Sequence, residues 1–187
     1  MAVDVVDLYI RSVASFGEAL TKVGLDEWQK PTPCPDWDMQ SLSVHVVSGE
    51  VQLVELVESG IVMDQEMDSG VLGSDPIATW RGAAIRAITI ARSTPLDTEL
   101  PHPKADLTFE SLLGARITEN AVHAWDLSQA LSLPCAVEDD IAGWLLDYWL
   151  PLFDFISDSE HFSSPVQPID DTPSARLLGL LGRNQKN

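Results

Sequence analysis

The chain has 187 residues, 45% of them hydrophobic, which is enough for one domain whose core needs no disulfide or structural metal. Its 29 acidic and 11 basic residues give a formal charge of -18, which repels nucleic acids and anionic membranes. No stretch approaches the roughly 20 apolar residues of a membrane span, and no positively charged segment precedes an apolar one at the N-terminus. We therefore expect a cytoplasmic protein with reduced cysteines and without nucleic-acid or membrane partners.

The first apolar stripe predicts a helix from Val6 to Val23. Its apolar residues are spaced alternately three and four apart, which places them on one face of a helix. Gly24 is the expected stop, because glycine readily adopts the left-handed conformation found just past many helix ends.

A second helix is expected after the proline-rich loop 31–35, with Asp36 or Asp38 as its N-cap and an end near Gly60. An acidic, turn-rich connection follows at 64–75. A third helix is expected from Pro76, after a cap at Ser74 or Asp75, and a fourth from Phe109 to about Leu131, capped by Thr108. A fifth helix after Pro134 carries Ile141 to Phe155. A last apolar turn runs from Leu177 to Leu181. The sequence does not decide whether the link between the third and fourth helices contains short strands.

Four long amphipathic helices with modest connections predict an all-α fold, namely an antiparallel four-helix bundle with additional short helices at the C-terminus. We expect residues 1–187 to form a single domain, with a C-terminal tail at about 158–187. Metal and ligand sites in such bundles are built from side chains that project inward, so inward-facing polar residues are the candidates for function.

On a helical wheel the fourth helix has one apolar side and one side turned away from it. Glu110, Thr118 and Gln129 fall on the side turned away. The apolar side carries Phe109, Leu112, Leu113, Leu127, Ala130 and Leu131.

Four polar residues interrupt that apolar side, namely Arg116, Glu119, Asn120 and His123. Their burial is costly unless they are paired or bound to a ligand. Glu119 and His123 are four residues apart and therefore adjacent on the helix surface. They can form a buried ion pair, or they can bind one metal ion from the same side.

The second helix offers a third ligand. His45 lies on its apolar face, and Gly49, one turn further on, leaves space beside it. His45, Glu119 and His123 together would suit zinc, nickel, iron or manganese, and three protein ligands leave a position for water or substrate. The alternative for His45 alone is a core histidine satisfied by hydrogen bonds.

Two neighbours of this group have alternative roles. Asp126 is a candidate hydrogen-bond acceptor for the ring nitrogen of His123 that does not bind the metal, or else an exposed helical aspartate. Arg116 is a candidate contact for a substrate carboxylate, or else a structural partner of Glu119 or another acid.

Other chemically active residues are interpreted as structural. Cys34 is interpreted as a small residue between prolines rather than a redox thiol, and His102 and His161 as exposed rather than metal ligands. Packing roles are assigned to Trp37, Trp80, Trp125, Trp144 and Trp149.

Three segments resemble one known family. The segment Thr32–Asp38 with Leu42, Val44 and His45 after it, and the segment Glu119–Leu127, are similar to the metal-binding domain of mycothiol-dependent maleylpyruvate isomerases. The tail, with Phe162, Pro165, Val166 and Arg176–Arg183, resembles the ending of a short, single-domain actinobacterial subgroup of that family. The resemblance implies a DinB-like bundle whose metal is held by His45, Glu119 and His123.

The resemblance also implies a chemistry. In the isomerases the metal activates mycothiol, whose sulfur adds to a cis double bond, permits rotation and leaves. It therefore implies a divalent metal, with zinc the first choice, a low-molecular-weight thiol, and S-transferase or isomerase activity on a small molecule, with a homodimer plausible. We do not expect maleylpyruvate itself as substrate, because this chain ends without the additional C-terminal domain of the isomerases. A metal-assisted hydrolase and a non-catalytic metal-binding or regulatory module are the alternatives.

Overall fold

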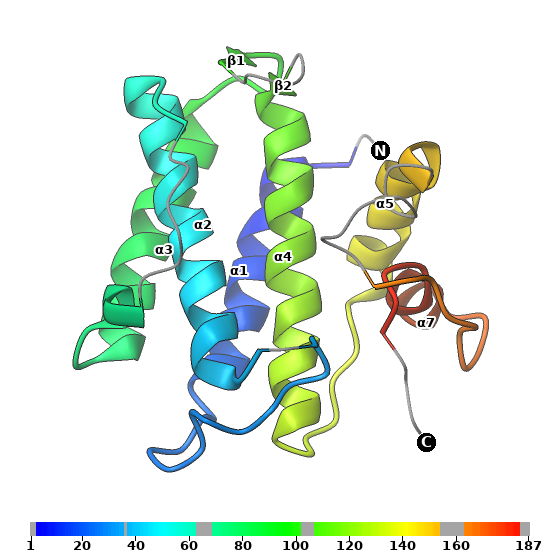
Figure 1. Ribbon diagram of the computed structural model, residues 1–187. Helices are drawn as coiled ribbons and strands as arrows, with labels where there is room; N and C mark the ends of the chain where they lie inside the picture. The colour runs from blue at the N-terminus through cyan, green and yellow to red at the C-terminus, as the bar shows by residue number, and fades with distance from the viewer. Residues whose placement is uncertain (1–2, 36, 63–68, 102–106, 154–162, 184–187) are drawn as a thin grey trace.

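The computed structural model describes residues 3–35, 37–62, 69–101, 107–153 and 163–183. Most of them are helical (Figure 1), which confirms the predicted all-α fold. In chain order the elements are α1 (Val5–Leu20), α2 (Met39–Ser59), the 3₁₀ turn η1 (Ser69–Leu72), α3 (Pro76–Ser93), β1 (Glu99–Leu100), β2 (Leu107–Thr108), α4 (Phe109–Ala130), α5 (Asp139–Trp149), the 3₁₀ turn η2 (Leu150–Leu152) and α7 (Pro173–Leu180).

The four long helices form a bundle in which α1 packs against α3 and α4, and α2 packs against α3 and α4. In Figure 1, α1 and α4 run in one direction and α2 and α3 in the other. The expected antiparallel packing therefore holds for the pairs α1–α3 and α2–α4, whereas α1–α4 and α2–α3 run parallel. The β1–β2 hairpin joins the end of α3 to the start of α4, with Glu99 opposite Thr108 and Leu100 opposite Leu107. None of the described helices is long and apolar enough to cross a membrane.

The starts of α2, α3 and α4 and the end of α2 lie where capping residues were expected. Asp38, Asp75 and Thr108 each accept a backbone N–H from the first turn of α2, α3 and α4. Asp36, the alternative cap for α2, lies outside the described residues. Gly60 ends α2 with a φ of 68°, a conformation that glycine adopts at little cost.

Two predicted helices are shorter than their apolar patterns. The first ends at Leu20 rather than Val23, because the chain continues through tight turns in which N–H groups bond to carbonyls three residues earlier. The fifth ends at Trp149 and continues as one 3₁₀ turn, because Pro151 has no N–H to donate and its ring crowds the preceding turn. Phe155, expected on the same helix, lies outside the described residues.

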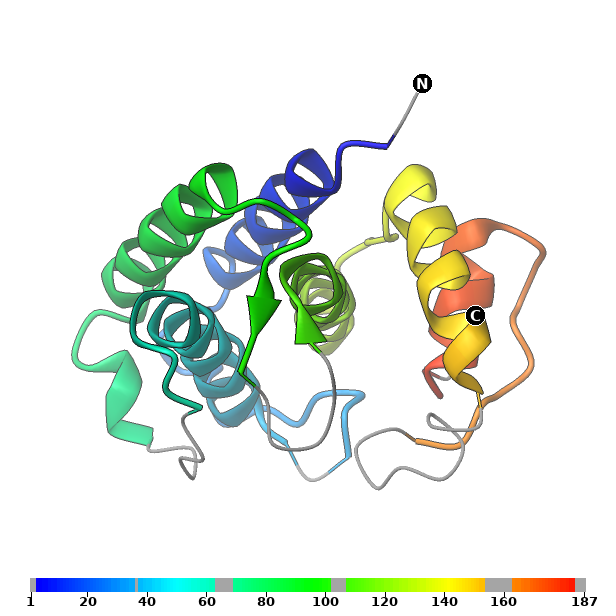
Figure 2. The same cartoon turned by 90° about the horizontal axis from the view of Figure 1, so that it is seen from above.

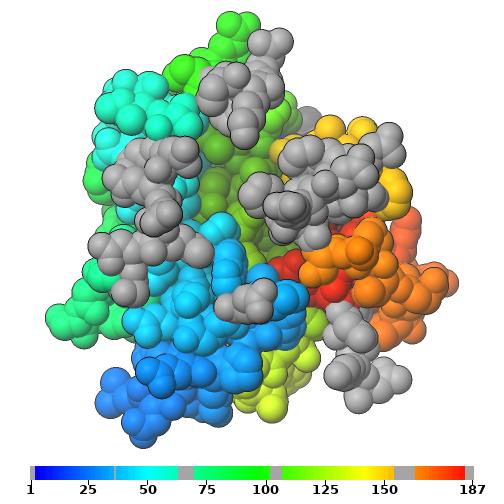
Figure 3. All heavy atoms as spheres, viewed as in Figure 1, coloured from blue at the N-terminus to red at the C-terminus, as the bar shows by residue number. Residues whose placement is uncertain are grey.

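The helix α4 is enclosed on nearly all sides. The pair α5 and α7 packs beside it, on the side away from α2 and α3 (Figures 1 and 2). On the face in Figure 3, part of α4 is visible beside α2. The prediction that Thr118 points away from the core is therefore wrong: it is buried, and its hydroxyl accepts a 2.8 Å hydrogen bond from the indole N–H of Trp149 on α5.

Candidate metal centre

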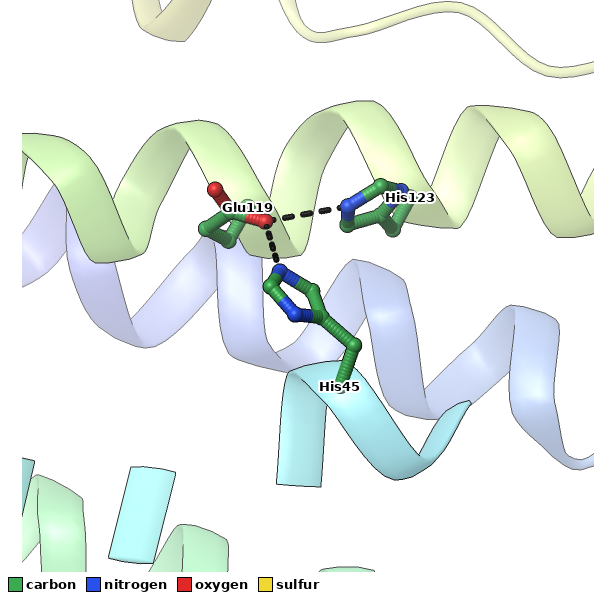
Figure 4. Close-up of side chains that lie close together, drawn as sticks. All are labelled: His45, Glu119 and His123. Atoms are coloured by element: carbon green, nitrogen blue, oxygen red, sulfur yellow. Dashed lines mark hydrogen bonds and ion pairs between the residues drawn. The ribbon is translucent and has the colours of Figure 1, made fainter. Parts of the chain in front are cut away.

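His45 on α2 and Glu119 and His123 on α4 converge, as Figure 4 shows. Glu119 Oε2 lies 2.8 Å from His45 Nε2 and 3.0 Å from His123 Nε2. The two imidazole rings are 5.4 Å apart and nearly perpendicular. One potential ligand atom from each residue lies within 4.8 Å of the others, so the structure brings together the three residues that the sequence selected.

The donor set fits a divalent ion. Two imidazole nitrogens and a carboxylate oxygen are common ligands of zinc and its neighbours, at about 2.0–2.1 Å. Tetrahedral geometry at those lengths separates ligand atoms by roughly 3.3 Å. The two pairs that include Glu119 differ from that value by a few tenths of an ångström, and all three ligand atoms lie within 4.8 Å of one another. Within the described part of the chain, no fourth His, Cys, Asp or Glu joins this group.

A pocket of about 160 Å³ opens directly onto these three residues. The loop before α2 forms one wall, and it closes on itself through hydrogen bonds between Thr32 and the backbone of Cys34 and Trp37. Both Cys34 and Trp37 line the pocket. The centroid of the Trp37 ring lies 4.6 Å from that of His45 and 5.7 Å from that of His123. Trp37 also packs against the apolar cluster between α1, α2 and α4, so its predicted packing role is confirmed, and its ring lies against the candidate ligands as well.

Asp126 is fully buried, so the alternative of an exposed aspartate is wrong. Its Oδ2 lies 2.9 Å from His123 Nδ1 and 2.9 Å from Arg183 Nη2. This contact favours the tautomer in which Nδ1 carries the proton and Nε2 faces Glu119. Arg183, which follows α7, was missed at the sequence level, because no periodic pattern links the end of the chain to α4.

The protonation states of Glu119 and His123 depend on the side chains that contact them. Burial alone would raise the pKa of Glu119, but hydrogen bonds from His123 and His45 outweigh it and hold that pKa well below its usual value. Burial likewise opposes charge on His123, yet its contacts with Asp126 and Glu119 raise its pKa. The raised pKa favours the doubly protonated imidazolium form of His123, which lies between two carboxylates. A bound cation would take the place of the proton on Nε2.

Arg116 is held by an acid that sequence reasoning did not single out. Its guanidinium donates to Oε1 of the fully buried Glu50 at 3.0 Å and to the carbonyl of Val46. Glu50 also accepts hydrogen bonds from Asn120 and from the Tyr9 hydroxyl. The structural alternative for Arg116 is thus observed, with Glu50 as its partner. A signal was present, because the residues three and four positions from Glu50 on either side are all apolar.

The contact between Asp126 and His123 gives a first prediction. In Asp126→Asn, we expect zinc affinity to fall about 10- to 100-fold, the usual range for partners that orient a metal-bound histidine. Equilibrium competition with a chelator measures this change. Asp140→Asn is the matched control, because it removes an aspartate paired with Arg11 at the exposed start of α5. Equal zinc affinities for the two variants would exclude an orienting role for Asp126.

The fold and the site together define a helical-bundle protein with a candidate metal centre of two histidines and one carboxylate. The sequence pattern of the mycothiol maleylpyruvate isomerase N-terminal domain matches residues 10–128, and the chain belongs to this family. The bundle is accordingly DinB-like. The matched segment contains all three candidate ligands and Asp126, whereas Arg183 lies beyond it.

Relatives of similar length also match. Two uncharacterized proteins of Mycobacterium tuberculosis, from strains CDC 1551 / Oshkosh and ATCC 25618 / H37Rv, are each 26% identical to this chain over 181 residues. The match covers 92% of this chain and 94% of each relative. No solved structure matches the chain significantly.

Proposed function

We propose that this protein is a metal-dependent enzyme that uses a low-molecular-weight thiol for an S-transfer to a small molecule or for the isomerisation of one. The observation that carries the proposal is the open centre: three potential ligands converge, and the space beside them is a pocket. An ion bound there would retain a position for an exogenous ligand, as catalytic centres do. The thiol is inferred from the family, whose name refers to mycothiol.

The protein's own residues have defined tasks in this proposal. His45, Glu119 and His123 hold the ion, and Asp126 keeps His123 in the tautomer that presents Nε2. Trp37 lies against the two imidazoles and limits the access of water from its side. A divalent ion, with zinc as our first choice, would lower the pKa of a bound thiol and so supply thiolate at neutral pH.

The test is a titration of cobalt-loaded protein with mycothiol and with cysteine. We expect a thiolate-to-cobalt charge-transfer band that grows with thiol and saturates. Because Cys34 lines the same pocket, the titration is repeated with Cys34→Ser, and the band must persist for it to come from the added thiol.

A loaded centre that gives no band with any thiol would contradict the thiol proposal. Ester or amide hydrolysis by the same loaded protein would then favour metal-assisted hydrolysis. A loaded centre with neither property would favour a binding or regulatory module.

A further inference from the structure

A second pocket, of about 340 Å³, lies between α2 and the N-terminal half of α4. Aliphatic side chains form most of its wall, including Leu53, Leu56 and Leu112. Ile61 and Val62, which are 57% and 45% exposed, stand at its edge. A wall of this kind accommodates an apolar body and gives little orientation by itself.

Arg116 provides the charged contact in this pocket. It is 7% exposed and lines the pocket. Among the described residues, only Nε and Nη2 of Arg116 donate hydrogen bonds, to Glu50 and to the carbonyl of Val46. Nη1 lies over Gly49, where a Cβ would come within 2.0 Å of it. Nη1 of this nearly buried guanidinium therefore has no hydrogen-bond acceptor among the described residues and can donate to a ligand.

The same pocket reaches the candidate metal centre, because Glu119 lines both this pocket and the one beside His45 and His123. Glu50 already balances the charge of Arg116. Without an ion, the negative charge of Glu119 would oppose an anion in the pocket. A divalent ion on Glu119 would reverse that effect, so anion and ion are expected to strengthen each other's binding.

We infer that this pocket binds a small carboxylic acid with an apolar chain, whose carboxylate meets Arg116 Nη1 and whose chain lies along the leucines. The inference rests on the proposed function in one respect, namely that this acid is the substrate that the metal centre acts on. The shared Glu119 places the bound acid beside the candidate ligands.

Octanoate is the probe, and 1-octanol is the matched ligand without the charge. Calorimetry on zinc-loaded protein is expected to show octanoate binding at least about tenfold more tightly than octanol, the effect of one charge-assisted hydrogen bond. Gly49→Ala is expected to remove about the same factor, because the new methyl group would meet Nη1, Cζ and Nη2 of Arg116 and displace the guanidinium. Urea unfolding of this variant shows whether it stays folded, and Ile61→Glu tests the pocket without touching the guanidinium.

Ile61→Glu tests the location without disturbing the core, because Ile61 is exposed. A carboxylate at the pocket edge should weaken octanoate binding about tenfold by like-charge repulsion. Ile85→Glu is its control: Ile85 is 60% exposed on α3 and does not line the pocket.

Each result decides one claim. No octanoate binding, or octanol binding equally well, would overturn the inference. If Ile61→Glu leaves the affinity for octanoate unchanged, the acid binds elsewhere, for example on the ion itself, and this result would also overturn the inference. Octanoate binding with the expected sensitivities to a chain that holds no metal would support the pocket while contradicting the proposed function.

Discussion

Replacing Glu50 with alanine is expected to cost about 3–5 kcal/mol of folding free energy, the usual loss when one partner of a buried ion pair is removed. Glu50 is fully buried and accepts hydrogen bonds from three side chains on two other helices, those of Tyr9, Arg116 and Asn120. Without it, no carboxylate among the described residues forms an ion pair with the nearly buried guanidinium of Arg116. Urea unfolding followed by circular dichroism measures the difference.

Glu58→Ala is the control for this prediction, because Glu58 lies on the same helix and pairs with Arg86 at the surface. Its loss should stay below about 1 kcal/mol. Adding Arg116→Met to Glu50→Ala should recover part of the loss, because no uncompensated charge then remains in the core. Equal losses for Glu50→Ala and Glu58→Ala would show that the buried contacts are not important for stability.

Glu119→Gln is expected to lower zinc affinity by more than about 100-fold, beyond the effect of losing an orienting partner. The amide keeps the size of the side chain but removes the negative charge that both imidazoles contact. His45→Ala and His123→Ala should have effects of similar size, since each removes one of three potential ligands. Competition with a chelator measures affinity, and circular dichroism confirms that each variant is folded.

Glu110→Gln is the matched control, because Glu110 is exposed in the first turn of the same helix. It should bind zinc as tightly as the native protein. If Glu119→Gln also binds zinc normally, the three residues are a buried polar cluster rather than a metal site.

Local signals were sufficient to predict much of this structure. Capping residues and apolar periodicity placed the starts of α2, α3 and α4 within a residue or two, because these signals act over one or two helical turns. The spacing of Glu119 and His123 put them on one face, and the inward position of His45 supplied the third member of the group. The inward faces of the two helices and the family resemblance indicated the same three residues.

The errors on Thr118 and Arg183 share a physical cause, which is that a sequence pattern does not show what covers a helix. Thr118 was assigned to the outer side of α4 because a two-sided wheel has no place for α5. Arg183 reaches Asp126 from 57 residues away, and no local pattern encodes such a contact. The length of α5 was overestimated for a different reason, since the apolar spacing continues past Pro151 although the helix does not.

The most direct test of the metal centre is the metal content of untagged protein, measured by mass spectrometry on the native chain and after loading with zinc, nickel, manganese or iron. We predict close to one divalent ion per chain, held by the native protein and by Glu110→Gln and lost from the folded variants of His45, Glu119 and His123. A native protein that retains no ion after loading with any of these metals would contradict the metal centre and the function proposed from it.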